Sequence, residues 1–426
     1  MAYQRTRECN YPPKNRSNVM IRALFFILCF LGQGFAENPA ILMNAEAFGF
    51  GPSAAIGEIF PYLRERVDRL SYIGTGHTLD IQRDFPYDNI FDMSAQDPIA
   101  RKARFDEIAK NYDIFLTACD FETARWAKEL GLKVVVYDPL TWYWKEIPGI
   151  IGDVDLYISQ NFFGVEERFK QEPEKFPSHV IVPPLVSGYG KIEEHPHKKL
   201  LLVNMGGLSN PFLENQELVS LAKVIFGIVK RELEPAFEQT VYLTSKAIVD
   251  GCQEVCKAET LQPLQVQALL KKSTFAFMTS GLGNLYEGAA LKKTILWLPP
   301  ANDSQGQQAK LLQKYGMIDY AVDWHDLLDQ DPIDYFAPQE EVLKRIAASM
   351  KALAINFEAQ KRLAEYFKMA WEKSKGARGT NPVLFKLTMK FGEGGAKQAA
   401  ECVLNWVSCW MSDMNSVDQI ASQLAE

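Results

Sequence analysis

The sequence lacks several features that would place it in other classes of protein. Its seven cysteines are odd in number and form no CxxC pair, and no histidine pair lies at zinc-ligand spacing beside Cys252 and Cys256. Free thiols in a reducing compartment are therefore favoured over disulfides or a zinc site. The sequence has no long basic run, and its formal net charge of −7 argues against nucleic-acid binding. Beyond the first 38 residues, no apolar run is long enough to span a bilayer.

The first 38 residues form a leader with two interpretations. From Met20 a short basic start is followed by an apolar run, Ala23 to Leu31, and by small residues at Gly34 and Ala36. This order resembles a secretory signal peptide. The alternative is a leader without structure, or a start codon assigned too early. The sequence weighs the two about equally.

With 426 residues, the chain is too long for one ordinary hydrophobic core. Buried-strand patterns alternate with helical patterns, which predicts doubly wound parallel sheets. The pattern stops at the polar segment 187–198 and then restarts. We therefore predict an α/β protein with two Rossmann-like domains facing a cleft. The predicted parts are residues 1–38 (leader), 39–190 (first domain), 198–390 (second domain) and 391–426 (helical tail).

Residues 274–308 are the most informative segment. An apolar run is followed by a turn of small residues, Ser280 to Gly283, then by Asn284 and a helical pattern that contains Glu287. A second apolar run leads into a polar segment, predicted as a loop, that carries Asp303, Gln307 and Gln308. Small residues at a helix N-terminus allow backbone N–H groups to approach a phosphate. Carboxylates and amides further along suit ribose and sugar hydroxyls, so the segment predicts a pocket for a nucleotide-diphosphate sugar.

This segment resembles the donor-binding region of GT-B glycosyltransferases. It is most similar to the bacterial family that adds N-acetylglucosamine to the lipid-linked peptidoglycan precursor. The matching positions are Ser280-Gly281, Glu287, Pro299 and the Gln307-Gln308 pair. The resemblance implies a UDP-sugar donor, inversion at the anomeric carbon, and no metal or cofactor. It also implies a cytoplasmic location, with contact at a membrane surface left open.

Each predicted domain begins with a strand and a glycine turn. The first turn contains Gly49 and Gly51 and lacks the third glycine of a dinucleotide fingerprint. In the resembling family this turn approaches the acceptor and carries a histidine, whereas Ser53 follows Gly51 here and no histidine is present. The second turn, Gly206 and Gly207 with Ser209, is predicted to contact the donor diphosphate. For both turns the alternative is an ordinary tight βα turn.

Three residues of the first half are candidates for the general base. His77 lies in a glycine-rich loop at a strand end, Asp138 ends a buried strand, and Glu46 precedes the first glycine turn. Trp142, just beyond Asp138, is placed to stack on an acceptor. The alternatives are a surface histidine, a helix-capping aspartate and an aromatic side chain of the core.

These observations predict transfer of a hexose from a nucleotide-diphosphate sugar to an unidentified acceptor. Two other functions stay open. A nucleotide-sugar epimerase of the same fold would share the donor contacts and would need several acid or base groups in the cleft. A binding protein without catalytic activity would fit the missing histidine after Gly51.

Overall fold

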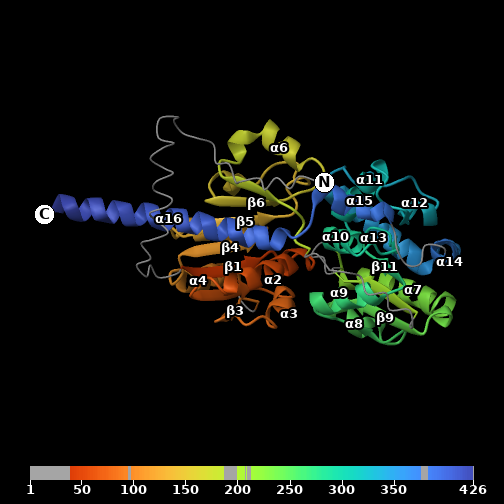
Figure 1. Cartoon of the computed structure of the whole chain (residues 1–426). Coiled ribbons are helices and arrows are strands. Elements are labelled where there is room, and N and C mark those ends of the chain that lie inside the picture. The colour runs from red at the N-terminus through yellow and green to blue at the C-terminus, as the bar shows by residue number, and fades with distance from the viewer. Residues whose placement is uncertain are drawn as a thin grey trace.

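The computed structural model describes residues 39–94, 97–186, 199–206, 208, 213–375 and 382–425. The side chains of residues 382 and 413–425 are outside this description. The predicted leader 1–38 and the predicted domain boundary at 187–198 lie outside the described residues as well. The described chain forms two α/β bodies side by side (Figure 1).

The first body is built on a parallel sheet of seven described strands. Their order is β3-β2-β1-β4-β5-β6-β7, and every pair is parallel. Helices cover both faces of the sheet, and the strands are therefore apolar without alternation, as in the fully buried run Val134 to Val136. The strands are β1 (Ala40–Ala45), β2 (Arg69–Gly74), β3 (Ile90–Asp92), β4 (Ile114–Ala118), β5 (Lys133–Asp138), β6 (Leu156–Gln160) and β7 (His179–Val182).

Helices connect these strands and cover the sheet. Side-chain caps fix several starts: Asp97 accepts from the backbone N–H groups of Ile99 and Ala100, and Asp120 accepts from that of Thr123. The helices are α2 (Gly51–Arg64), α3 (Thr78–Gln82), α4 (Pro98–Ala109), α5 (Phe121–Glu129) and α6 (Val165–Gln171), with short 3-10 turns η1 (Gly149–Gly152) and η2 (Pro173–Lys175).

The second body repeats the same plan. Its six described strands have the order β10-β9-β8-β11-β12-β13, all parallel. Both sheets therefore follow the Rossmann order, in which the crevice between the first and fourth strands is the usual ligand site. The strands are β8 (Leu200–Met205), β9 (Gln239–Thr244), β10 (Ala258–Glu259), β11 (Phe275–Met278), β12 (Ile295–Trp297) and β13 (Tyr320–Ala321).

The helices of the second body lie on both sides of its sheet. The predicted fold class, two Rossmann-like doubly wound parallel-sheet domains, is confirmed. The helices are α7 (Asn215–Glu232), α8 (Lys246–Cys252), α9 (Pro263–Lys272), α10 (Leu282–Ala290), α11 (Asp303–Lys314), α12 (Trp324–Leu327), α13 (Gln339–Ile355), α14 (Phe357–Ser374) and α15 (Pro382–Phe391), with the 3-10 turn η3 (Glu234–Ala236).

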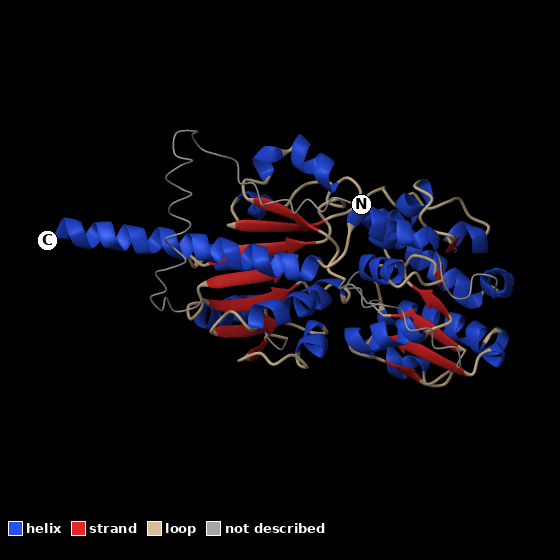
Figure 2. Cartoon of the chain, in the orientation of Figure 1, coloured by secondary structure: helices blue, strands red, loops and turns tan. Residues whose placement is uncertain are grey.

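The C-terminal helix α16 (Gly395–Ala425) returns to the first body. It packs against α2, β6 and β7, and Figure 2 shows it crossing in front of the first sheet. The returning chain is held against the outgoing one, because Gly394 N–H donates to the Val186 carbonyl at 2.7 Å and Gly395 N–H to that of Pro184 at 2.9 Å. A Cβ at Gly395 would lie 1.8 Å from the Pro183 carbonyl oxygen, so the close crossing requires glycine there. The helical tail thus belongs spatially to the first body.

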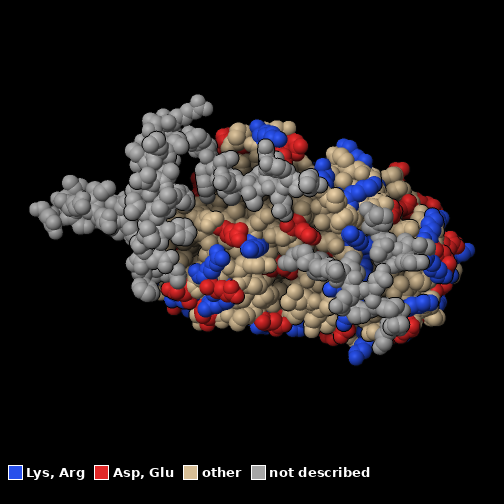
Figure 3. All heavy atoms as spheres, viewed as in Figure 1, with Lys and Arg blue, Asp and Glu red and all other residues tan. Residues whose placement is uncertain are grey.

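The surface carries charges of both signs. Lys and Arg side chains are interspersed with Asp and Glu on the face seen in Figure 3. Among the described helices, none combines the length and the apolar character that a bilayer crossing needs.

Candidate functional site

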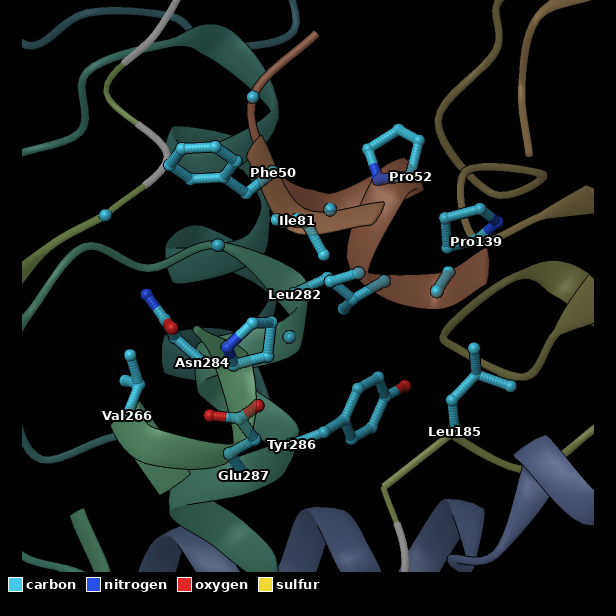
Figure 4. Close-up of a pocket in the computed structure, with 18 of the residues that line it drawn as sticks. Phe50, Pro52, Ile81, Pro139, Leu185, Val266, Leu282, Asn284, Tyr286 and Glu287 are labelled. Atoms are coloured by element: carbon cyan, nitrogen blue, oxygen red, sulfur yellow. The ribbon is translucent and has the colours of Figure 1, made fainter. Parts of the chain in front are cut away.

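A cavity of about 300 Å³ lies between the two bodies, at the carboxyl ends of their strands. The first body lines it with the loop before α2, the start of α2 and the segment after β5. The second body lines it with the ends of β8 and β9, with α9, and with the starts of α10 and α11 (Figure 4). Both sheets thus present the edge at which open α/β sheets bind ligands. Its charged lining residues, among those described, are Glu58, Asp80 and Glu287.

The start of α10 offers backbone donors to this cavity. Gly281 precedes the helix, and no side chain caps it. Gly281 and Gly283 both line the cavity, and a Cβ at either position would meet no atom within 4 Å. Asn284 lines it too, while its Nδ2 donates to the Thr279 carbonyl at 2.9 Å. An uncapped helix N-terminus facing open space is a ready site for a phosphate or another anion.

Ser280 has a different place from the one predicted. Its side chain is fully buried outside the cavity lining, and its Oγ donates to the Gln305 carbonyl at 3.1 Å. This bond ties the turn before α10 to the first turn of α11. Ser280 therefore positions the two helix starts relative to each other.

Glu287 lies one and a half turns into α10 and lines the cavity, with its carboxyl pointing into the open space in Figure 4. Gln267 Nε2 of α9 donates to its Oε1 at 3.3 Å. Burial, and after it the nearby Glu58 carboxyl, raises the pKa of Glu287 to about 7, while the hydrogen bond from Gln267 acts in the opposite direction. A carboxylate held in this way can accept hydrogen bonds from a ligand hydroxyl.

The segment from Asp303 to Gln308 is helical, which corrects the predicted loop. Asn302 caps α11 by accepting from Gln305 N–H at 2.9 Å. Ser304 and Gln308 lie one turn apart and share the cavity-lining face. Gln308 is only 2% exposed, and its Oε1 has no hydrogen-bond partner among the described residues. A buried amide oxygen left unpaired at a cavity wall lacks a hydrogen-bond donor, which a ligand or a water molecule can supply.

The structure does not bring Asp303 and Gln307 to the cavity lining. Asp303 Oδ2 accepts from the Tyr143 hydroxyl of the first body at 2.6 Å, and Gln307 Nε2 donates to the Tyr335 carbonyl at 2.8 Å. Both are buried. They lie one helical turn apart, on a face of α11 next to the face that carries Gln308. A loop prediction assigns no such helical phase.

The two glycine turns reach the cavity as far as the structure describes them. Gly49 and Gly51 line it on one side, and Gly206 lines it on the other. Gly206 N–H donates to Asn204 Oδ1 at 2.8 Å. Gly207 and Ser209 lie outside the described residues.

Two other predicted acceptor residues are part of the packing. Ser53 is fully buried, and its Oγ donates to the Thr78 carbonyl at 3.0 Å. The Trp142 ring packs against Phe162 at 4.9 Å between centroids, and its Nε1 donates to the Pro139 carbonyl. Neither is among the cavity-lining residues.

Asp138, one of the predicted bases, is fully buried next to the cavity but outside its lining. Its carboxyl accepts from Tyr157 Oη at 2.6 Å, Trp144 Nε1 at 2.7 Å and Leu140 N–H at 2.6 Å. Burial raises its pKa, and these hydrogen bonds act in the opposite direction. With its lone pairs already engaged, Asp138 organises the loop after β5.

Of the three predicted bases, His77 lines a hollow beside the main cavity. This second hollow shares Phe50 and Asp80 with the main cavity. Its Nε2 is 2.5 Å from the Gly49 carbonyl, and its ring meets Phe50 edge-on at 5.4 Å. Because a carbonyl oxygen only accepts, Nε2 carries the hydrogen in the neutral ring and Nδ1 is the acceptor.

Glu46 lies outside the cavity lining. Burial, followed by repulsion from Asp120, raises its pKa to about 7. Its backbone N–H donates to the Ala118 carbonyl, which holds the end of β1 beside that of β4.

The sequence reasoning missed Glu58 and Gln267, which both line the cavity. Glu58 is the single charged residue between Gly51 and Leu63 in an otherwise apolar helix, and this isolation was the available signal. Among the described residues, no group of three or more His, Cys, Asp or Glu side chains is arranged to hold a metal ion.

No protein-family model matches the sequence, and no curated protein matches it. The predicted similarity to glycosyltransferases is found among solved structures. MurG of Acinetobacter baumannii is 12% identical with a TM-score of 0.47, covering 86% of this chain and 99% of its own. A UDP-glucosyltransferase of Polygonum tinctorium that glucosylates indoxyl is 12% identical with a TM-score of 0.45 at the same coverage.

A third similar structure belongs to a protein of Listeria monocytogenes assigned as a UDP-N-acetylglucosamine 2-epimerase. It is 13% identical with a TM-score of 0.47, covering 84% of this chain and 94% of its own. Identities and TM-scores at this level do not assign an activity.

Proposed function

We propose that the chain is a glycosyltransferase that transfers a hexose from a nucleotide-diphosphate sugar, with UDP-sugars as the first donors to test. One observation carries the proposal. A half-buried carboxyl, an uncapped helix N-terminus and an unpaired buried amide oxygen, contributed by Glu287, α10 and Gln308, line the same cavity between two Rossmann-ordered sheets. These groups suit the ribose, the diphosphate and the sugar of one ligand.

In this proposal the second body binds the donor. Glu287 accepts hydrogen bonds from ribose hydroxyls, and the first N–H groups of α10 hold the diphosphate together with the turn at Gly206. Gln308 receives a hydrogen bond from a hydroxyl of the sugar. As the bond to the sugar breaks, negative charge grows on the diphosphate, and the fixed dipole of α10 stabilises that charge.

The first body supplies the acceptor side. Phe48, Phe50, Pro52 and Ile81 give it an apolar wall, which suits an acceptor with apolar surface. We assign the general base to His77, since Nδ1 is its acceptor when Nε2–H donates to the Gly49 carbonyl. The base takes the proton of the acceptor hydroxyl, the hydroxyl oxygen forms the new bond to the anomeric carbon, and the nucleoside diphosphate leaves.

Two observations favour the alternatives. The carboxyls of Glu58, Asp80 and Glu287 all line the cavity, which gives an epimerase the several acid or base groups it needs. None of His77, Asp138 and Glu46 lines the main cavity, which suits a binding protein without catalysis.

The test is product analysis with the full chain and radiolabelled UDP-glucose, UDP-galactose and UDP-N-acetylglucosamine, with and without a mixture of apolar alcohols and glycolipids. Labelled acceptor or donor hydrolysis above background supports a transferase. An epimerised donor formed without acceptor indicates the epimerase. Nucleotide-sugar binding with neither product leaves the non-catalytic binding protein.

A further inference from the structure

The side chain of Gln267 joins the two walls of the cleft. Its Nε2 donates to Glu58 Oε1 of α2 in the first body at 3.2 Å and to Glu287 Oε1 of α10 in the second at 3.3 Å. One amide nitrogen has two hydrogens, so each carboxyl receives one of them. All three side chains line the cavity.

This arrangement is unfavourable for the ligand-free fold. Burial raises the pKa of both Glu58 and Glu287, and the charge of Glu58 raises that of Glu287 further. Two half-buried carboxyls that share a single donor repel each other once they ionise. An apolar side chain at position 58 would match the rest of α2 and avoid this cost. Local arrangements that oppose stability are expected at functional sites.

A second observation in the same cavity points to a ligand. Gln308, also a cavity-lining residue, has an Oε1 without a partner although the residue is 2% exposed. Among the described residues, the cavity therefore holds one buried acceptor without a donor, beside two carboxyls that share the donor nitrogen of Gln267. The groups that would complete these contacts are hydrogen-bond donors. Because both carboxyls accept from the same nitrogen, they lie near enough to each other for neighbouring hydroxyls of one ligand to reach both.

We propose that Glu58 and Glu287 bind one vicinal diol between them, the 2′ and 3′ hydroxyls of a nucleotide ribose. This rests on the proposed function and adds Glu58, a residue of the acceptor-side body, as a determinant of nucleotide specificity. Each hydroxyl donates to one carboxylate, and the Gln267 amide continues to separate the two charges. The bound ribose thereby links the two bodies.

The assignment predicts a measurable preference for ribose. A hydrogen bond to a charged group contributes roughly tenfold or more to affinity. Removing the diol from the ligand, or the charge of Glu58 from the protein, should each remove part of the same interaction. When both changes are made together, the fold-loss in affinity should be smaller than the product of the two separate fold-losses, because both changes remove the same contact.

The experiment is calorimetric titration of the full chain with UDP, 2′-deoxy-UDP and 2′,3′-dideoxy-UDP. Wild type should prefer UDP over the dideoxy compound by at least about tenfold. Glu58→Gln should reduce this preference by about tenfold while the dideoxy compound binds as before. Glu65→Gln is the matched control, since Glu65 follows the same helix and is exposed. A thermal melt checks that each variant is folded.

Two outcomes overturn different claims. If wild type binds none of UDP, GDP, ADP and CDP, the proposed function itself is overturned. If wild type binds UDP and Glu58→Gln keeps the full ribose preference, the donor site stands and the role of Glu58 is overturned. Equal weakening of all three ligands by Glu58→Gln would also overturn it, because that result indicates a general effect on the cleft.

Discussion

The Glu287 side chain lines the cavity in which we propose that the ligand binds, and its ionisation opposes the stability of the fold. Burial raises its pKa from 4.5 to about 7, so the folded chain holds this proton more tightly than the unfolded chain does. The stability that this contributes is fully present below about pH 4.5 and is lost as the pH rises through 7. At alkaline pH the ionised Glu287 carboxyl therefore lowers the stability of the ligand-free protein.

We expect Glu287→Gln to stabilise the ligand-free protein at pH 8, because glutamine stays neutral. The gain should be on the order of 1–2 kcal/mol at pH 8 and close to zero at pH 5. Paired melting curves of wild type and variant at the two pH values measure it. An equal shift at both pH values would show that packing, and not ionisation, causes the difference.

His77 and Asp138 were equivalent candidates in the sequence, and the structure separates them. His77→Ala should lower turnover by about 10²–10⁴-fold with donor affinity preserved, as expected for loss of a general base. Asp138→Asn should retain turnover and lose roughly 1–3 kcal/mol of stability, because the new amide group would face the donors of Trp144 and Tyr157. Turnover assays and denaturant titrations of both variants measure the two effects. The reverse pattern would identify Asp138 as the base.

At the scale of elements, α10 is the helix whose position matters most. Its N-terminus is uncapped, lines the cavity, and follows β11 at the crevice between β8 and β11. The bond from Ser280 to the Gln305 carbonyl fixes it relative to α11. The two helix starts are therefore tied together along one wall of the cavity.

A carboxylate in the first turn of α10 should act in opposite directions on stability and binding. Gly283→Asp places a negative charge at the helix N-terminus, where no atom lies within 4 Å of the new Cβ. We expect the helix dipole to stabilise the fold by about 0.3–1 kcal/mol, and loss of the helical glycine acts in the same direction. UDP binding should weaken by tenfold or more through repulsion of the diphosphate. Gly283→Asn is the near-isosteric control, and equal UDP affinity in both variants would place the diphosphate elsewhere.

The strands and the main helices could be predicted from the sequence, because parallel strands buried on both faces appear as unbroken apolar runs. The strand-turn-helix unit at 274–290 was read correctly for the same reason. The phase of α11 could not be predicted, since residues 303–308 are polar or glycine and show no apolar stripe. Asp303 and Gln307 were therefore grouped with Gln308, although they lie on another face.

Contacts between distant parts of the chain were beyond the sequence pattern. Glu58 and Glu287 are separated by more than two hundred residues, and only the packing of two bodies brings both to Gln267. The return of α16 to the first body is similar, because its apolar face shows that it packs but not against which element.

At the scale of the whole molecule, the two bodies are joined by several contacts around the cleft. Tyr143 donates to Asp303, and the Tyr286 hydroxyl donates to the Asn161 carbonyl at 2.6 Å. A third bond joins the two bodies, because Gln262 Nε2 donates to the Asp80 carbonyl at 2.8 Å. These bonds surround the cavity, so a ligand held by both walls would share in fixing the relative position of the bodies.

The central claim is that this cleft binds a nucleoside diphosphate in one orientation. The most direct measurement is a crystal structure of the full chain with UDP. The account predicts ribose hydroxyls within hydrogen-bond distance of Glu287 and the diphosphate at the N-terminus of α10. UDP bound outside the cavity, or bound in it with the diphosphate away from α10, would contradict the account.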